Sequence, residues 1–430
     1  MRQKNIAIIG AGTAGIATAI ILAQQNFQVS IFEKVDQLNP VGAGLLIQPT
    51  GLAVFEHLGV LEHALSLAKI VTGLEGQLPQ QKLLINSHYK QAHPNFYGLG
   101  IHRASLTHIL EKRASEFPEC ICWHMGHDIS KITEKSSEIL IEGEFKKQPF
   151  SKNFDLVIIA NGAKSYLRPE SWVKINKPYP WGAKWIIVPE CQQLDPHILH
   201  QFYYHSQTMM GIMPTGKLPH QSQQLSSIFW SMPIEKLDHF LTKKYPLDAW
   251  LLYLNRHWPI VAEWLQSIQP HIDDPTKWLS AQYRDVVMTK FGQKRIGVIG
   301  DAAHAMSPQL GQGTNMALLD AWALGQSFQK ATQQKHLDLD TLWQYYHQQR
   351  WSSSHFYQFF SRLLTPLYQS HALWTGPFRD FTFSMMYQIP FFRKEMAITI
   401  SGLKSGMFST MQYEKIAQSY KKQTSPFVSK

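Results

Sequence analysis

The 430-residue chain has few cysteines and no long apolar stretch. Three cysteines cannot form a disulfide framework for a chain of this length, and they fit a protein kept in a reducing compartment. No uninterrupted apolar run approaches the roughly 18 residues that a membrane-spanning helix needs. The N-terminus starts basic, but its apolar run is too short for a signal peptide and leads directly into glycines. These absences predict a cytoplasmic location.

Charged residues are also few and dispersed. They make up 17% of the chain against 44% hydrophobic residues, a balance typical of a globular protein able to enclose a cofactor. The net charge is +10, yet Lys and Arg form no long run and no nucleic-acid-binding motif accompanies them. We therefore expect a solvated basic surface and no nucleic-acid partner.

The N-terminal segment predicts one βαβ unit, with strands at 5–9 and 28–32 around a helix at 13–25. Between the first strand and the helix stands a G-x-G-x-x-G turn. Gly10 permits the turn, Gly12 lets the backbone approach a pyrophosphate, and Gly15 lets helix and strand pack closely. The helix start at Thr13 and Ala14 offers free N–H groups to phosphates.

An acid follows at the end of the second strand. Glu33, beside Lys34, stands where a carboxylate can accept both ribose hydroxyls of a dinucleotide. It would repel a phosphate at the ribose 2′ position. We therefore predict a dinucleotide site, without a bound NADP, at the carboxyl edge of these strands.

The rest of the chain predicts the domain organisation. Strands at 155–160 and 296–299 look like further parts of the first layer, whereas 178–233 turns β-like and the chain from 337 onward is mainly helical. Breaks in that helical part are expected at Pro366, Gly376, Pro377 and Pro390. The predicted fold class is α/β: a Rossmann-like cofactor-binding domain (1–177 and 286–335), an inserted β-sheet substrate domain (178–285) and a helical C-terminal region (336–430).

A second glycine-rich segment follows the strand at 296–299. It begins Gly300-Asp301 and carries further residues suited to close backbone approach and a helix start, namely Pro308, Gly311, Gly313, Thr314 and Asn315. With the N-terminal turn, the segment 100–106 and the loop 41–46, it resembles the FAD-dependent monooxygenases typified by para-hydroxybenzoate hydroxylase and the ubiquinone-pathway hydroxylases. The resemblance covers most of residues 4–325.

The resemblance assigns roles to these residues. It implies that Asp301 holds the ribityl chain of FAD and that Pro308, Gly311 and Gly313 carry the backbone past the flavin ring. The helix start at Thr314 and Asn315 would direct N–H groups at the N1–C2=O edge, where positive partial charge favours reduced flavin. The remaining expected contacts are Arg103, a cation misplaced against a helix dipole, and Gly44 and Leu45 in the loop beside the ring.

One motif departs from the family pattern. Where the family commonly has Asp-Gly after a central strand, this chain has Asn161-Gly162, followed by Ser165 and Arg168, which fit the pattern. An amide keeps hydrogen-bond geometry but loses the charge, which puts the mode of nicotinamide binding in question. His304 is read either as a proton relay or, more commonly, as a structural neighbour of the flavin loop.

The resemblance also implies an activity. FAD would be reduced by NAD(P)H as a transient reductant and would react with O₂ as co-substrate, so that a flavin C4a-hydroperoxide hydroxylates an aromatic or polycyclic small molecule. No catalytic side chain is assigned, because the cofactor carries the chemistry. The expected substrate pocket includes Met213, Pro214 and Trp230. Alternatives are a flavin-dependent halogenase, although its W-x-W-x-I-P signature is absent, a reductase or oxidase on the same scaffold, or a non-catalytic ligand-binding flavoprotein.

Two further segments suggest other functions. Cys120, Cys122, His124 and His127 resemble metal ligands, but no second ligand pair follows, so we expect no metal and a strand near the adenine end of the cofactor. The C-terminal aromatics predict an internal or dimer face rather than peripheral membrane contact, which stays open. The chain is expected to be a monomer or homodimer.

Overall fold

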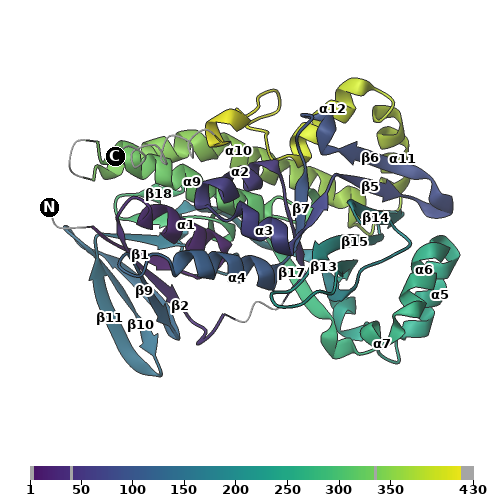
Figure 1. Cartoon of the computed structure of the whole chain (residues 1–430), viewed down its shortest axis with the longest axis horizontal. Coiled ribbons are helices and arrows are strands. Elements are labelled where there is room, and N and C mark those ends of the chain that lie inside the picture. Colours follow the sequence, from purple (N-terminus) through teal and green to yellow (C-terminus); the bar gives the residue numbers. More distant parts are fainter. Residues whose placement is uncertain (1–3, 39–41, 334–336, 418–430) are drawn as a thin grey trace.

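The computed structural model describes residues 4–38, 42–333 and 337–417, arranged as two large sheets joined by long strands and covered by helices (Figure 1). The first sheet has six strands in the order β18-β19-β12-β1-β2-β8. Its members are β1 (Asn5–Ile9), β2 (Gln28–Glu33), β8 (Ile121–Met125), β12 (Leu156–Ile159), β18 (Gly292–Gln293) and β19 (Ile296–Val298). All pairs are parallel except β18–β19. The α/β class is confirmed.

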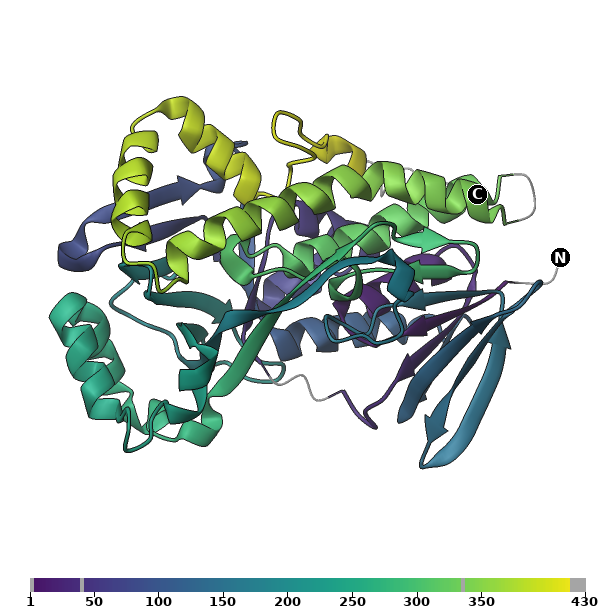
Figure 2. The ribbon, with the colours of Figure 1, turned by 180° about the vertical axis from the view of Figure 1, so that it is seen from behind.

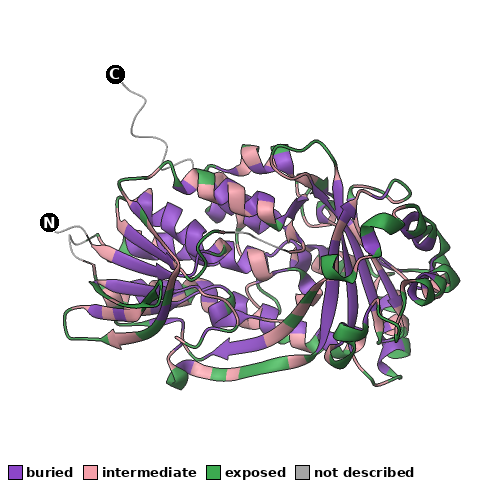
Figure 3. Ribbon diagram, turned by 90° about the horizontal axis from the view of Figure 1, so that it is seen from below, coloured by how far each residue is buried: buried purple, intermediate pink, exposed green. Residues whose placement is uncertain are grey.

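Helices enclose this sheet because its central strands β1 and β12 are apolar and almost wholly buried. In α1 (Thr13–Ala23) every residue after Thr13 is buried, since the helix packs against the sheet, α4 (Arg103–Ala114) and α9 (Gly313–Ala331). Next to these helices, α2 (Pro49–Leu58) and α10 (Leu339–Tyr368) pack against α9, and α3 (Leu61–Leu67) packs against α4. Figure 3 shows the strands of both large sheets as mostly buried, with exposure concentrated on outer helices and loops.

Two small antiparallel sheets flank the first. One is formed by β9 (His127–Glu134), β10 (Ile139–Phe145) and β11 (Gln148–Phe154), which project as an arm at one end of the molecule (Figure 2). The other is formed by β3 (Gly44–Ile47), β7 (Gly98–His102) and β4 (Lys69–Val71). This second small sheet lies between the cofactor edge expected from the sequence and the other large sheet.

The second large sheet has seven strands in the order β17-β13-β16-β15-β14-β5-β6. They are β5 (Gly73–Gln77), β6 (Leu83–His88), β13 (Val173–Pro189), β14 (Ile198–Tyr204), β15 (Thr208–Gly216), β16 (Leu225–Pro233) and β17 (Leu279–Met288). Strands β5 and β6 precede the range 178–285 expected for this part, and β14 pairs in parallel with β5. The sheet is therefore assembled from two separate stretches of the chain.

Different layers cover the two faces of this sheet. One face packs on α5 (Leu247–His257), α6 (Pro259–Ser267) and α7 (Gln269–Ile272) through a tryptophan-rich core around Trp250. The other face packs on the second half of α10 and on α11 (Thr375–Met386), with Tyr203, Phe229 and Tyr357 at the centre. The sequence predicted a β-rich segment here and missed the helices α5–α7.

The C-terminal region is helical, as expected, and ends its described part after α12 (Pro390–Ile400). The predicted break at Pro366 is wrong, because α10 continues to Tyr368. Pro366 lies in the last turn of α10, so the backbone hydrogen bond that a proline cannot make affects only the end of the helix. Gly376 and Pro377 open α11, and Pro390 is the first residue of α12. None of the described helices is both long and apolar enough to cross a bilayer.

Candidate cofactor and substrate site

The N-terminal glycine turn closes on the neighbouring strand ends. Gly10 has φ of 109°, and a Cβ there would lie 2.6 Å from the carbonyl oxygen of Ala160. A Cβ on Gly15 would lie 1.9 Å from the carbonyl oxygen of Gly10. Both positions therefore exclude any side chain for packing reasons alone.

Gly12 differs because its surroundings are open. Nothing lies within 4 Å of a Cβ built there, although Gly12 caps the start of α1. The first helical hydrogen bond runs from the Ile16 N–H to the Gly12 carbonyl at 3.0 Å, so the amides of Thr13, Ala14 and Gly15 have no partner within the helix. Open space in front of free amides is a cradle for an anion.

Glu33 borders the same turn from the end of β2. Its Oε2 accepts the N–H of Ala11 at 2.9 Å, which links the acid to the glycine turn, and its Oε1 accepts the N–H of Val35 at 3.3 Å. A carboxylate has about four lone-pair positions, so this side chain retains capacity for hydroxyl donors. Lys34 beside it is exposed.

The Gly300-Asp301 strand end meets the N-terminal turn directly. Gly300 has φ of 60°, and a Cβ there would lie 2.8 Å from Cβ of Ala14. The Asp301 side chain is exposed and sits near Gly313, while Ala302, Ala303 and His304 behind it are buried. The two glycine motifs, distant in sequence, therefore form one edge.

A buried ionic cluster holds this strand end in place. The fully buried carboxylate of Asp320 accepts the N–H of Gly300 at 2.7 Å, His304 Nε2 at 2.6 Å and Arg350 Nε at 2.7 Å. Burial alone would raise the pKa of Asp320, but the facing His304 and Arg350 outweigh it and hold the pKa well below its usual range. His304 thus has the contacts of a structural residue.

The Asn161 segment forms the third side of the edge. Arg168 is buried and donates to the carbonyls of Ala302 at 2.9 Å and Ala163 at 3.1 Å, so it joins this segment to the Asp301 loop. The Asn161 Oδ1 is shielded from solvent without a hydrogen-bond partner in the described structure. An unsatisfied acceptor at such an edge is available to a ligand that donates a hydrogen bond.

The start of α9 lies across the loop 306–313. Gly311 has φ of 61° and Pro308 opens a short 3₁₀ turn before it. The first α9 hydrogen bond, from Met316 N–H to the Gln312 carbonyl at 2.8 Å, leaves the amides of Gly313, Thr314 and Asn315 without helical partners. The helix therefore presents its positive end toward the expected flavin position.

The side chain of Asn315 has a structural task. It is fully buried, its Oδ1 accepts the Gln48 N–H at 2.8 Å, and its Nδ2 donates to the carbonyls of Leu46 at 3.1 Å and Gly311 at 3.3 Å. Asn315 thereby fixes the end of β3 against the start of α9. Because the Asn315 side chain is used in this way, only its backbone N–H remains free to contact a cofactor.

Gly44 and Leu45 are the first residues of strand β3, and the segment from Gly42 to Leu45, called here the Gly44 loop, links the two large sheets. The Gly44 N–H donates to Ser227 Oγ at 3.1 Å, and a Cβ on Gly44 would lie 2.8 Å from Cε of Met213. Arg103, the exposed first residue of α4, lies beside Gly42, since a Cβ there would be 3.3 Å from its Nε. The neighbouring residues 39–41 lie outside the described structure.

The predicted substrate residues divide between the two faces of the seven-stranded sheet. Met213 pairs with Ser227 and faces the Gly44 loop. Trp230 lies on the opposite face, where its ring packs 5.5 Å from that of Trp250, and the alternation of β15 places Pro214 on that face too. The structure therefore does not bring Trp230 and Pro214 together with Met213, because strand alternation defines two faces without saying which one meets the cofactor.

An aromatic cluster that sequence reasoning missed lies on the same face as Met213. The Trp185 Nε1 donates to the Tyr283 hydroxyl at 3.0 Å, and the rings of Trp185 and Phe229 are 4.8 Å apart. Burial raises the pKa of Tyr283 well above its usual value, against the opposing effect of the nearby Arg103, so its phenol stays protonated. Because side chains alternate along a strand, Phe229 could have been placed on the same face as Ser227 from the sequence alone. Tyr283 could not, because β17 reaches this face only by pairing with the distant strand β13.

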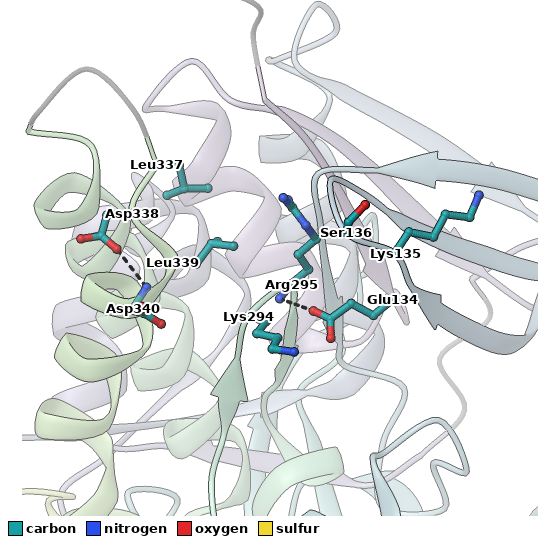
Figure 4. A pocket seen from close by; sticks show the side chains of 9 residues that line it. All are labelled: Glu134, Lys135, Ser136, Lys294, Arg295, Leu337, Asp338, Leu339 and Asp340. Carbon is teal, nitrogen blue, oxygen red and sulfur yellow. Dashed lines mark hydrogen bonds between the residues drawn. The ribbon is translucent and has the colours of Figure 1, made fainter.

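Two surface hollows lie at opposite edges of the six-stranded sheet. The larger, of about 660 Å³, is lined by residues such as Glu134, Arg295 and Asp338 (Figure 4). Arg295 precedes β19, so this hollow is at the amino edge of the sheet, opposite the glycine motifs. A smaller hollow of about 450 Å³, lined in part by Asp36, Trp123 and Met125, lies near the carboxyl ends of β2 and β8, beside Glu33.

The cysteine and histidine segment has no metal-site geometry. Across the described ranges, no three His, Cys, Asp or Glu side chains are grouped so as to hold a metal ion. Instead the His124 ring stacks 4.4 Å from that of Phe32, and burial lowers the pKa of His124 to about 4. Strand β8 borders the edge next to Glu33.

These residues fit FAD. The open cradle at Gly12, the free amides of α1 and α9, the exposed Asp301 carboxylate and the unsatisfied Asn161 acceptor lie along one edge and match a group with a pyrophosphate, hydroxyls and a hydrogen-bonding ring. The edge ends at the Gly44 loop, against the aromatic face of the second sheet.

Known proteins share this organisation. The 3-hydroxybenzoate 6-hydroxylase of Klebsiella oxytoca is 23% identical over 348 residues, covering 74% of this chain and 78% of that protein. Kynurenine 3-monooxygenase of Drosophila willistoni is 24% identical, with 82% and 76% covered. The crystal structure of a Klebsiella pneumoniae HpxO variant complexed with FAD has the same fold, with a TM-score of 0.72 at 18% identity over 95% of this chain and 100% of that one.

A family model also matches most of the chain. A model described as an FAD binding domain matches residues 3–353, which include both glycine motifs, the Asn161 segment and the strands of the second sheet. Related proteins are named hydroxylases and monooxygenases. The chain belongs to this FAD-binding family and is an FAD-dependent oxidoreductase.

Proposed function

We propose that this protein is an NAD(P)H-driven, FAD-dependent monooxygenase that hydroxylates an aromatic or polycyclic small molecule. The observation that carries the proposal is the contact of the Gly44 loop with Met213 and Ser227. It joins the cofactor edge to the sheet face that bears Trp185, Phe229 and Tyr283. A ring-shaped apolar substrate would thus lie against the cofactor.

The residues of the edge would divide the binding of FAD among them. The amides after Gly12 would bind the pyrophosphate, Glu33 the ribose and Asp301 the ribityl chain, while the start of α9 would stabilise negative charge on the ring. When bound, FAD supplies electron transfer from NAD(P)H and the activation of O₂. Pro308, Gly311 and Gly313 would leave room for the ring, and Arg103 would lie alongside it.

The aromatic cluster would bind and orient the substrate. The Tyr283 phenol accepts from Trp185, which leaves its own proton available for an oxygen or nitrogen of the substrate. Met213, Phe229 and Trp185 would exclude water, which protects the reaction from unproductive peroxide release. No side chain here needs to be a general acid or base.

The first test is an anaerobic titration of the purified protein with NADPH and then NADH, followed by its visible spectrum. We expect a flavin spectrum that is bleached by at least one of them, and then oxygen uptake stimulated by some phenols or quinols with formation of a hydroxylated product. Chloride-dependent product would instead support a halogenase, and stoichiometric peroxide without oxygenated product an oxidase. Flavin that no reductant bleaches, with or without candidate ligands, would overturn the self-sufficient monooxygenase.

A matched pair of variants tests the substrate site separately. Tyr283→Phe should keep the flavin spectrum and its bleaching but lower substrate-stimulated product formation about tenfold, because one hydrogen bond of roughly 1.4 kcal/mol is lost. Tyr345→Phe, on α10 away from the cluster, should match the wild type. Equal activity of both variants would remove Tyr283 from the proposed site.

The same proposal covers the setting of the enzyme. A monomer or homodimer in the cytoplasm suits a chain with three unpaired cysteines. Light scattering of the purified holoenzyme measures the oligomeric state, and fractionation of cells measures the location.

A further inference from the structure

Exposed apolar side chains are concentrated from the second half of α10 to the start of α12. Among the described residues, 11 of the 20 large apolar side chains that are exposed lie between Phe359 and Phe392. The most exposed aromatics there are Trp374 and Phe381, both at 67%, and Phe391 at 62%. Monomeric soluble proteins rarely concentrate apolar side chains in this way unless the surface binds something. We call the part of the surface formed by α11 and α12, whose ribbons are shown in Figures 1 and 2, the apolar corner. Its exposed apolar side chains are Trp374, Phe378, Phe381, Met385, Met386, Ile389, Phe391 and Phe392.

The apolar corner is held rigidly with these side chains outward. On the inner side of α11, Gly376 packs against the backbone of His205, and a Cβ there would lie 2.7 Å from His205 Cα. Arg379 is fully buried between the rings of Tyr203 and Tyr368, at 5.0 and 5.2 Å from their centroids. This inner face fixes the rotation of α11, so the outer aromatics cannot turn into the core.

The apolar corner has unpaired positive charge and no unpaired negative charge in the described part of the chain. Its two carboxylates are neutralised internally: Asp380 pairs with Arg379 at 2.6 Å, and Glu395 pairs with Lys404. The cations Arg393 and Lys394 follow Phe391 and Phe392 directly, and neither has a carboxylate partner within the described part of the chain. The surface therefore combines exposed aromatics with uncompensated positive charge.

We propose that the apolar corner docks on the surface of an anionic lipid bilayer. Trp and Phe side chains partition to the boundary between headgroups and acyl chains, and adjacent Lys and Arg are attracted by anionic headgroups. A second copy of the chain fits less well, because the same corner on that copy would also carry Arg393 and Lys394 and would offer no free carboxylate to complement them. The absence of a spanning helix from the described structure restricts the contact to the surface.

The test is co-sedimentation of the full-length holoenzyme with vesicles of phosphatidylcholine, with and without phosphatidylglycerol. We expect binding to the anionic vesicles, weakening as salt rises. The double variant Phe381→Ser/Phe391→Ser should lower the partition coefficient at least tenfold, because two apolar side chains leave the interface. Leu252→Gln, at an equally exposed leucine on α5, is the matched control and should bind as the wild type does.

Flavin absorbance and elution volume show whether each variant is folded. Arg393→Gln/Lys394→Gln should remove most of the salt-sensitive part of binding. The proposal is overturned if the folded wild type ignores anionic vesicles, or if the double Phe variant binds them undiminished. It is also overturned if the wild type is a dimer that the double Phe variant splits while vesicle binding is absent, since a second copy then covers the corner.

Discussion

Gly12 and Gly15 belong to one turn but stand in different surroundings. Gly12 has φ of −79°, which any residue adopts, and open space around it, whereas Gly15 faces the carbonyl oxygen of Gly10 at a distance that no Cβ tolerates. One glycine is thus required by folding and the other, on the proposal above, by the cofactor.

This difference predicts opposite results for the same substitution. Gly12→Ala should leave the free energy of unfolding within about 0.5 kcal/mol of wild type but weaken FAD binding at least tenfold, since its methyl group would occupy the cradle. Gly15→Ala should destabilise the apoprotein by about 2 kcal/mol or more. Urea unfolding and fluorescence titration with FAD measure both; a Gly12→Ala protein with normal FAD affinity would remove the pyrophosphate from this turn.

A buried imidazole makes stability depend on pH. Burial lowers the pKa of His57 to about 4 from an ordinary value near 6.5. Below pH 6.5 His57 is therefore protonated in the unfolded chain but still neutral in the folded chain. The free energy of unfolding consequently falls as the pH drops toward 4. The loss from this residue should reach about 2 kcal/mol at pH 5.

The variant His57→Gln should lose less stability than the wild type between pH 7.5 and pH 5. Urea midpoints at the two pH values give the comparison, and His239→Gln, at an exposed histidine, should leave the wild-type difference unchanged. Identical pH dependence in the wild type and His57→Gln would show that His57 is not the group responsible.

At the scale of elements, the start of α9 and the end of β3 act as one unit. Asn315 joins them through hydrogen bonds with Gln48 and Leu46, and the Gln312 side chain adds a further bond to that of Gln48. Because these groups are buried, removal of the amide leaves them without partners. The orientation of the α9 amides toward a ring thus depends on a side chain that would itself not touch it.

Asn315→Ala should lower the free energy of unfolding by about 2 to 4 kcal/mol and raise the Kd for FAD more than fivefold. The surface variant Asn255→Ala on α5 serves as the control and should change neither quantity. If Asn315→Ala weakened folding yet bound FAD normally, the start of α9 would not be a cofactor contact.

The sequence predicted those elements whose signals are local. The first βαβ unit, the strand before Gly300 and the helix after Gly313 follow from hydrophobic period and glycine positions, and the structure has them. Pairings between distant segments have no such signal. Three features depend on how whole helices and strands pack together. They are the pairing of β5 with β14, the Asp320–Arg350 contact between α9 and α10, and the sheet face on which Trp230 lies.

At the scale of the whole molecule, the proposed site is a seam among segments that are far apart in the chain. The N-terminal turn, the Gly44 loop, the Asp301 strand end and α9 meet only when both large sheets are in place. A ligand that touches all of them stabilises the entire folded state by mass action.

Removal of the flavin should therefore destabilise the whole protein cooperatively. With FAD at a thousand times its Kd, the holoenzyme should exceed the apoprotein by about 4 kcal/mol in free energy of unfolding, with a Tm several degrees higher. Differential scanning calorimetry with added FAD measures this, and FMN, which lacks the adenosine half, should restore less. If FMN restored the stability of the apoprotein as fully as FAD does, Gly12 and Glu33 would not contribute to cofactor binding.

The side chain of Gln312, at the start of α9, donates to the carbonyls of Thr399 and Ile400 at the end of α12. During synthesis, the loop 306–313 can form these hydrogen bonds only after the end of α12 has been made, almost 90 residues later. At roughly 5–20 residues per second, this leaves on the order of ten seconds in which the nascent chain holds an incomplete loop. We therefore expect FAD to bind late in synthesis, and we expect chains truncated before α12 to bind FAD more weakly than the full-length protein.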